Sequence, residues 1–178
     1  EEKSRQAVAK IQKEVTNLKN LVDDFLNFAR KPSLQVEEID FPEFLDEIRL
    51  YFSNQLATAK IHLRFHTEIK NIRADFYHLK RVFLNLIHNS IQAMDNGGII
   101  DVHASEEKNQ IKISIHDTGH GISTEDLKKI FDPFYTTKEF GNGLGLSFVQ
   151  KIVQAHGGVI LVHSELNKGT NMNITLPK

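Results

Sequence analysis

The sequence of 178 residues contains no cysteine, which excludes disulfides and thiolate metal sites. It has no apolar run near the ~20 residues that span a bilayer. The formal net charge is −1 and no basic cluster stands out, so nothing favours nucleic acid as a partner. A hydrophobic fraction of 40% indicates one globular domain, or a domain plus an appendage. The chain begins at Glu1 without a signal sequence, and we expect it to be a fragment of a longer protein.

The first 30 residues lack glycine and proline and predict one long helix. Its apolar residues alternate spacings of three and four, as in a coiled-coil seam, at Val8, Ile11, Val15, Leu18, Val22, Phe25 and Ala29. Such a helix needs partner helices from another copy or from upstream chain; the alternative is packing on its own domain. Pro32 ends the helix. We therefore predict one unit over residues 1–32 and a second over residues 33–178.

The second unit alternates predicted helices and strands. Capping signals and apolar spacing predict helices over residues 40–56, 75–94, 123–131 and 144–157. Alternating apolar residues predict strands over residues 61–65, 72–74, 99–105, 111–117, 159–164 and 171–176. Residues 132–143 have no clear period and predict a loop long enough to be a mobile lid.

The predicted strand 111–117 ends at an acidic residue, Asp117, and two glycines follow within the next four residues. The alternation places Asp117 on the apolar face of this strand, where an unpaired charge is costly and needs a donor from the protein or from a ligand. Gly119 and Gly121 allow a sharp turn and the close approach of a flat ligand. The pattern alone fits a tight turn around a satisfied aspartate as well as it fits a ligand site.

Two asparagines lie one turn apart on the predicted helix 75–94. Asn85 and Asn89 share a face, with Arg81, His88 and Gln92 beside them. A polar helix face usually just meets solvent. Two carboxamides at this spacing can also offer oxygens to magnesium, which takes few protein ligands and adds phosphate and water.

A second glycine-rich stretch, residues 141–146 (GNGLGL), leads into a predicted helix. Its backbone N–H groups and the positive end of the helix dipole favour an anion. It is not a Walker A loop, because Lys and Ser/Thr do not follow at the required spacing, and Leu146 stands where the dinucleotide fingerprint needs glycine. Lys138, just before it, could reach a phosphate. The alternatives are a ligand-free flexible loop and a solvated lysine.

Together these stretches resemble the conserved boxes of one family. Residues 84–89 (LNLIHN) are similar to its asparagine box, 117–121 (DTGHG) to its first glycine box, 131–134 (FDPF) to its phenylalanine box and 141–146 to its second glycine box, and Gly169 and Thr170 match a final glycine–threonine signal. The chain thus resembles the catalytic ATP-binding domain of sensor histidine kinases, within the gyrase, chaperone and mismatch-repair ATPase superfamily. Residues 88–93 and 134–138 are most similar to the nitrogen-regulation subgroup.

The resemblance implies a fold and an activity. The fold would be a two-layer α/β sandwich, a mixed sheet covered on one face by helices and preceded by one long bundle helix. The activity would be transfer of the γ-phosphoryl group of ATP, with Mg²⁺, to a histidine on an upstream helix, for relay to an aspartate of a response regulator. Residues 1–32 would be the second helix of the dimerisation and phosphotransfer hairpin and would form a homodimer. This part of the protein would be cytoplasmic.

The resemblance also implies roles for single residues. Asp117 would accept the adenine amino group, Asn89 would ligate magnesium, and Asn85 would assist with phosphate or the attacking group as the catalytic candidate. The complete set expected to bind nucleotide is Asn85, Asn89, Asp117, Gly119, Gly121, Ile122, Lys138, Gly141, Asn142, Gly143, Leu144, Gly145, Leu146 and Thr170.

Two departures from the family refine the prediction. Superfamily members that hydrolyse ATP carry Glu where this chain has Asn85, and a carboxamide cannot act as a general base for water. This favours phosphoryl transfer over an ATP-hydrolysing clamp. None of the 9 histidines lies in the phosphoacceptor motif, so the acceptor is expected upstream of Glu1. A nucleotide-free module that docks a regulator is the alternative from another functional class.

Overall fold

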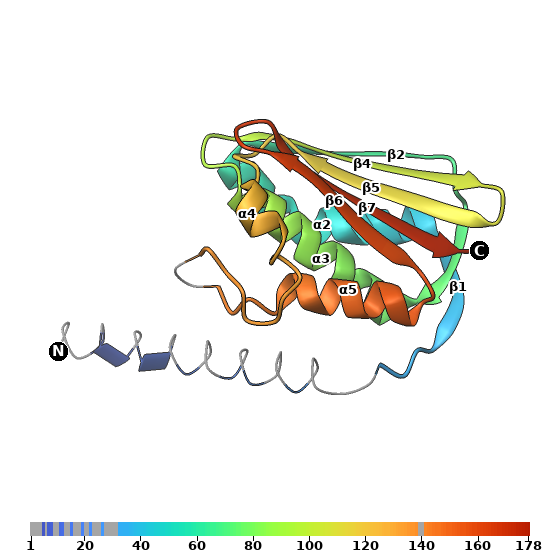
Figure 1. Ribbon diagram of the computed structural model, residues 1–178, viewed down its shortest axis with the longest axis horizontal. Helices are drawn as coiled ribbons and strands as arrows, with labels where there is room; N and C mark the ends of the chain where they lie inside the picture. The colour runs from blue at the N-terminus through green and yellow to red at the C-terminus, as the bar shows by residue number, and fades with distance from the viewer. Residues whose placement is uncertain are drawn as a thin grey trace.

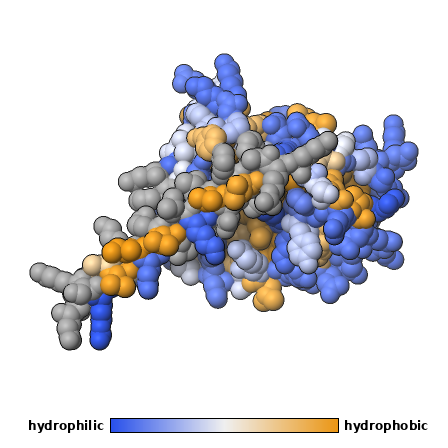
Figure 2. Space-filling model, turned by 90° about the horizontal axis from the view of Figure 1, so that it is seen from below, coloured by the Kyte–Doolittle hydropathy of each residue, from blue (hydrophilic) through white to orange (hydrophobic). Residues whose placement is uncertain are grey.

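The computed structural model describes residues 32–138 and 141–178 together with separate positions before residue 32. These positions have helical backbone and exposed side chains, and they are Arg5, Ala7, Val8, Ile11, Gln12, Val15, Lys19, Val22 and Leu26. Figure 2 shows apolar side chains exposed along this projecting segment. The other predicted seam positions, Leu18, Phe25 and Ala29, lie outside the described residues. The pairing of this helix with partners stays a prediction.

A five-stranded mixed sheet forms one layer of the domain, in the order β2-β4-β5-β7-β6. Its strands are β2 (Ile61–Thr67), β4 (Gly98–Glu107), β5 (Gln110–Asp117), β6 (Val159–Glu165) and β7 (Gly169–Pro177). β2 pairs with β4 in parallel, and the other neighbours pair antiparallel. The central position of β5 brings its C-terminal residue, Asp117, opposite Ile100 of β4 and Thr170 of β7.

Helices cover one face of this sheet (Figure 1). They are α2 (Phe41–Ala59), α3 (Phe76–Gln92) and α5 (Gly145–Ala155), with the short α4 (Thr124–Leu127) near one end. The core between the layers includes Phe41, Phe44, Phe52, Phe83, Leu86, Ile87, Ile100, Ile111, Ile113 and Ile115, all fully buried. The predicted two-layer α/β sandwich is therefore confirmed. Among the described residues no helix combines the length and apolar character needed to cross a membrane.

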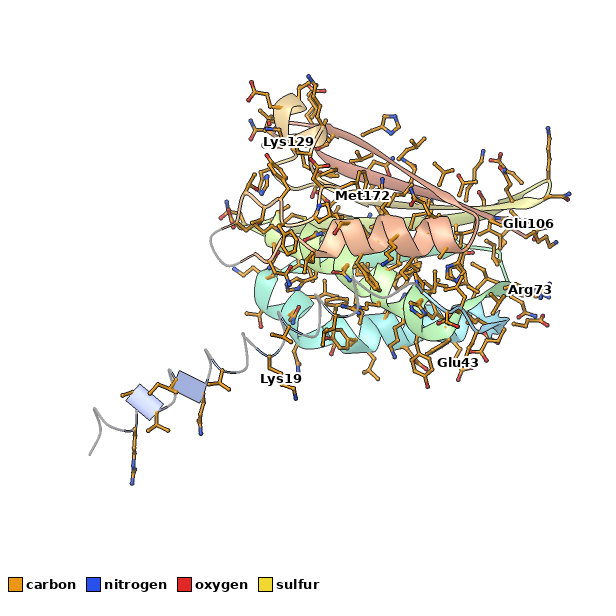
Figure 3. All side chains as sticks on the ribbon, turned by 60° about the horizontal axis from the view of Figure 1, so that its bottom comes forward. Lys19, Glu43, Arg73, Glu106, Lys129 and Met172 are labelled. Atoms are coloured by element: carbon orange, nitrogen blue, oxygen red, sulfur yellow. The ribbon has the colours of Figure 1, made fainter. Side chains whose placement is uncertain are left out.

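A two-stranded ribbon of β1 (Val36–Asp40) and β3 (Asn71–Asp75) lies apart from the main sheet. β3 corresponds to the short strand predicted at residues 72–74, whereas β1 was not predicted. β1 buries only Ile39, and two glutamates interrupt any apolar alternation. The ribbon marks the end of the domain where Arg73 and Glu106 are labelled in Figure 3.

Asp75 connects three parts of the chain at the start of α3. Its Oδ1 accepts from the N–H of His78 (2.9 Å) as an N-cap, and its Oδ2 accepts from the N–H of Gln35 (2.8 Å). Its own N–H donates to Nε2 of His156, just beyond α5 (3.0 Å). Burial raises the pKa of Asp75, but the donors from Gln35 and His78 outweigh it, so the pKa lies below its ordinary value.

The helix predicted over residues 123–131 is shorter than expected. Ser123 caps α4 as predicted, with its Oγ accepting from the N–H of Asp126 (3.1 Å), but the helix ends at Leu127. The following residues make three-residue turns, because Lys129 N–H donates to Asp126 O and Asp132 N–H to Lys129 O. Such bonds tighten the chain into turns in place of an α-helix.

Candidate functional site

A cavity of about 1160 Å³ opens between α3, the loop that precedes α5 and the ends of β5 and β7. All the residues predicted to bind nucleotide line it except Gly119: Asn85, Asn89, Asp117, Gly121, Ile122, Lys138, Gly141, Asn142, Gly143, Leu144, Gly145, Leu146 and Thr170. Met172, labelled in Figure 3 on the inner side of β7, also contributes to the lining. The structure thus brings together residues that are up to 85 positions apart (85 to 170) in the sequence.

Asp117 is buried at the end of β5 and retains capacity for a ligand. Its Oδ1 accepts from the N–H groups of Gly119 (3.0 Å) and Thr170 (3.2 Å), and its Oδ2 accepts from Oγ of Ser90 (3.0 Å). A carboxylate offers about four acceptor positions. Three protein donors leave one position, on Oδ2. The aspartate thus has protein donors, as the first alternative from the sequence requires, and its role as a ligand site stays a prediction.

The two glycines after Asp117 serve packing between backbones. A Cβ atom at Gly119 would lie 2.6 Å from the carbonyl oxygen of Ala93, and one at Gly121 would lie 2.1 Å from that of Glu165. Gly121 also has a φ of +71°, which other residues rarely adopt. Gly119 therefore lies against the C-terminal end of α3 and donates its N–H to Asp117; its contact with a ligand stays a prediction.

Asn89 points its carboxamide oxygen at a cation. Its Oδ1 accepts from Nζ of Lys138 (3.0 Å), and the same ammonium donates to Gln92. Burial lowers the pKa of Lys138; burial and the charge of Lys138 lower the pKa of His88 nearby. The oxygen of Asn89 therefore faces a positively charged group in the cleft. A single amide oxygen fits magnesium when phosphate and water supply the other ligands.

Asn85 faces the start of α5. Its Nδ2 donates to the carbonyl oxygen of Arg81 (2.8 Å), and a Cβ atom at Gly145 would lie 2.8 Å from its Oδ1. Only glycine fits at position 145 without displacing this side chain. Asn85 therefore lies between α3 and the glycine-rich stretch, where its carboxamide oxygen can contact a group bound at the start of α5.

The N-terminus of α5 opens into the cavity through residues 141–146. Leu144 is its N-cap residue and provides no side-chain bond to the first turn. The N–H of Leu144 itself donates to Oδ1 of Asn142 (3.1 Å). Leu144 thus leaves the first N–H groups of α5 without a cap from its own side chain, and together with the helix dipole these groups favour a bound anion.

The loop that precedes α5 is closed at its base. The N–H of Phe134 donates to the carbonyl oxygen of Gly143 (3.0 Å), and Gly143 has a φ of +65°. Tyr135 donates from its hydroxyl to Asp126; this bond raises the pKa of Tyr135 and lowers that of Asp126. The two contacts hold the ends of the loop beside the cavity. Its movement as a lid stays a prediction.

Two serines of this site were missed in the sequence. Ser90 donates to Asp117 from the apolar side of α3. Ser164 on β6 accepts from the N–H of Ile122 (2.9 Å) and contacts Oγ1 of Thr170 (2.9 Å), which connects two residues of the predicted nucleotide-binding set. Both interrupt an apolar face, the same signal that singled out Asp117.

Comparison with known proteins agrees with this geometry. Residues 74–178 match the family described as histidine kinase-, DNA gyrase B-, and HSP90-like ATPase. The chain belongs to this ATPase family. Sensor histidine kinase ZraS of Escherichia coli (strain K12) is 37% identical over 93% of this chain and 36% of that protein. Sporulation kinase E of Bacillus subtilis (strain 168) is 35% identical over 94% of this chain and 23% of that protein. The chain thus spans at most 36% of the length of these two curated relatives.

Solved structures show the same fold. The nucleotide-free catalytic domain of histidine kinase ThkA superposes with a TM-score of 0.73 at 31% identity, over 82% of this chain and 97% of that one. Full-length ShkA in complex with AMPPNP gives a TM-score of 0.88 at 26% identity, over 97% and 38% of the two chains. ThkA in complex with response regulator TrrA gives 0.78 at 27% identity, over 94% and 49%. The family resemblance drawn from the sequence boxes is confirmed.

Proposed function

We propose that this chain is the ATP-binding kinase domain of a sensor histidine kinase, which transfers the γ-phosphoryl group of ATP to a histidine on an upstream helix. The observation that carries the proposal is the meeting of three features in one cavity. They are the remaining acceptor position of Asp117, the amide oxygen of Asn89 directed at a cation, and the uncapped start of α5. In a bound nucleotide, Asp117 would face the base, Asn89 would face the metal ion, and the start of α5 would face the phosphates.

Each group has a task in this proposal. Asp117 accepts the adenine amino group, and Ile122 and Thr170 line the base pocket. Asn89 would hold Mg²⁺ through its carboxamide oxygen, the metal would neutralise charge on the phosphates, and Lys138 would contact a phosphate oxygen. The glycine-rich stretch 141–146 supplies backbone N–H groups to the phosphates. The protein thereby contributes positioning and charge neutralisation, which dominate catalysis of phosphoryl transfer.

Asn85 supports transfer over hydrolysis. Its Nδ2 is bound to the carbonyl oxygen of Arg81, and its Oδ1 belongs to an amide, which does not take a proton from water at neutral pH. An ATP-hydrolysing clamp would need a base at this position. A nucleotide-free docking module does not account for a buried carboxylate with an acceptor position left over.

Partners follow from the same proposal. The phosphoryl group passes to an aspartate of a response regulator, and the structural relative ThkA was solved with one, TrrA. Residues 1–32 form the second helix of the dimerisation and phosphotransfer hairpin, residues 33–178 form the kinase domain, and the full protein is a homodimer whose kinase domain is cytoplasmic. We also propose that the chain is most similar to the nitrogen-regulation subgroup, and the amino-acid sequences of residues 88–93 and 134–138 support this.

Two measurements test the function. Calorimetric titration with ATP and Mg²⁺ should show binding to the chain. Incubation with γ-labelled ATP should leave the chain unlabelled and release little phosphate, because the acceptor motif is absent and Asn85 does not activate water. A longer protein that includes the upstream helix should acquire an acid-labile label, as a phosphoramidate is.

The other outcomes decide between the alternatives. Lack of nucleotide binding supports the docking module. Rapid release of phosphate supports the hydrolysing clamp. Stable phosphate on the chain alone means that one of its own side chains is the acceptor.

A further inference from the structure

Lys138 makes two side-chain contacts with α3 inside the cavity. Its Nζ donates to Oδ1 of Asn89 (3.0 Å) and to Oε1 of Gln92, which lies nearly one turn further along the helix. All three residues line the cavity, and the resemblance to the kinase family gives Gln92 no role. The two bonds tie the loop before α5 to the C-terminal half of α3.

A bond to His88 fixes the orientation of Gln92. The carboxamide oxygen of Gln92 accepts from the ammonium of Lys138, so its NH₂ group is the donor toward Nε2 of His88, 2.9 Å away. In the reversed orientation the NH₂ group would face the ammonium, and neither group could accept. His88 therefore helps to keep the oxygen of Gln92 directed at Lys138.

The same contact reaches the glycine-rich stretch 141–146 through the backbone of Lys138. The N–H of Lys138 donates to Oγ1 of Thr136 (3.1 Å), and its carbonyl oxygen accepts from the N–H of Gly141 (3.3 Å). The side chain of Lys138 therefore connects α3 to the stretch whose N–H groups the proposed function assigns to the phosphates.

The groups joined by this contact are ones that a nucleotide would need. In the proposed function the oxygen of Asn89 faces a metal ion and the ammonium of Lys138 faces a phosphate. Two positive charges at one amide oxygen repel each other, because their Coulomb energy is unfavourable at so short a distance. The contact of Lys138 with Asn89 and Gln92 therefore competes with the arrangement that binds nucleotide.

We propose that Gln92 is a positioning residue, which holds Lys138 on α3 and thereby lowers the affinity of the site for nucleotide. The effect on affinity rests on the proposed function. A protein that binds its ligand only in an open arrangement has an apparent dissociation constant that rises as the open fraction falls. Loss of the Gln92 oxygen removes one of the two bonds from Lys138 to α3, so the open fraction should rise and nucleotide should bind more tightly.

Hydrogen exchange and calorimetry on the chain as it stands test the inference in Gln92→Ala. Without added nucleotide, the hydrogen-bonded amides of Lys138 and Gly141 should exchange about fivefold faster than in the wild type, as expected for the loss of one exposed hydrogen bond. AMPPNP with Mg²⁺ should bind about fivefold more tightly. Gln55→Ala removes the same side chain from an exposed position of α2 and should change neither quantity.

Lys138→Met provides a control of opposite sign. It removes both the contact with α3 and the ammonium assigned to a phosphate, so the amide of Gly141 should exchange faster while AMPPNP binds more weakly. A gain of affinity in Gln92→Ala together with a loss in Lys138→Met shows that Gln92 acts through Lys138, because a role in the packing of α3 alone would not raise affinity.

Three results would overturn the inference. Weaker binding of AMPPNP in Gln92→Ala means that Gln92 itself contacts the nucleotide. Unchanged exchange means that its oxygen does not hold Lys138, and faster exchange with unchanged affinity means that the contact does not oppose binding. If Gln92→Ala does not fold by circular dichroism, Gln92→Met is judged by the same two measurements. Failure of the wild type to bind AMPPNP removes the proposed function and with it the effect on affinity, and the exchange rates then show separately whether Gln92 holds Lys138.

Discussion

Replacement of Asp117 by asparagine should separate ligand recognition from folding. The protein dictates how the new amide is oriented, because the Oδ1 position receives two backbone N–H groups, from Gly119 and Thr170. The amide oxygen must occupy this position, since an NH₂ group there would face two donors. The NH₂ group then takes the Oδ2 position, beside Ser90 and the remaining acceptor position that we assign to the adenine amino group.

The magnitudes follow from this orientation. The hydroxyl of Ser90 can rotate to accept from the new NH₂ group. The two backbone bonds become neutral and weaken, which should lower the free energy of unfolding by about 1–2 kcal/mol. The hydrogen bond to the adenine amino group is lost, because the NH₂ group of asparagine is a donor and replaces the carboxylate oxygen that accepted this bond. We expect ATP affinity to fall by at least about tenfold, or about 1.4 kcal/mol.

The assay compares the wild type, Asp117→Asn and Ser90→Ala. Calorimetric titration gives the ATP affinity, and urea unfolding of the same samples gives the stability. Ser90→Ala removes a donor from Oδ2 but keeps the acceptor, so it should retain most of the affinity. A folded Asp117→Asn variant with wild-type affinity for ATP would refute the role of Asp117 in the site.

Four further predictions concern the loop before α5, Gly143 within it, Gly157 after α5 and the start of α3. Hydrogen exchange of the amides in residues 132–143 should slow when ATP binds, because closure supplies the phosphate contacts; equal exchange with and without ATP contradicts a closing lid. Gly143→Val should weaken ATP binding, since its φ is +65° and its Cβ would lie 2.4 Å from the carbonyl carbon of Phe134. Gly157→Ala, after α5 at a φ of +73°, should instead lower stability by about 1 kcal/mol with little change in affinity, as titration and urea unfolding would show. The pKa of Asp75 is lowered on folding, so its contribution to stability is present above its unfolded pKa near 3.8 and is lost as pH falls through the folded value. Urea unfolding between about pH 5 and pH 2 should show a smaller loss of stability in Asp75→Asn than in the wild type; an identical loss would show that other groups account for the acid sensitivity.

The fold could be predicted where one face of an element is apolar. The alternation of Ile111, Ile113 and Ile115 gave β5 its place in the core and showed that Asp117 was unusual. The apolar stripe of α3 predicted both ends of that helix to within two residues. β1 could not be found in this way, because it buries only Ile39 and is held by pairing with β3. Pairing without burial of one face leaves no apolar period in the sequence of β1.

The sequence predicted most residues of the site but few of the contacts between them. The glycine-rich stretches and the two asparagines were visible as residue types at fixed spacing. The bond from Lys138 to Asn89 was not, because loop residues have no periodicity from which a direction can be read. Ser164 could have been found as a polar residue on the apolar face of β6. The stacking of Arg81 on Phe148 depends on how α3 and α5 pack, which local sequence does not encode.

The hydrogen bond from the N–H of Thr170 to Asp117 affects when, during its synthesis, the chain becomes able to bind ATP. β7 follows every other described strand in the chain, yet it supplies part of the cavity wall and one of the donors that hold the carboxylate. A nascent chain that has completed only β2 to β6 lacks that wall, so nucleotide cannot stabilise it. ATP therefore favours the finished domain alone, by mass action on the state that binds it, and gives no help to incomplete intermediates.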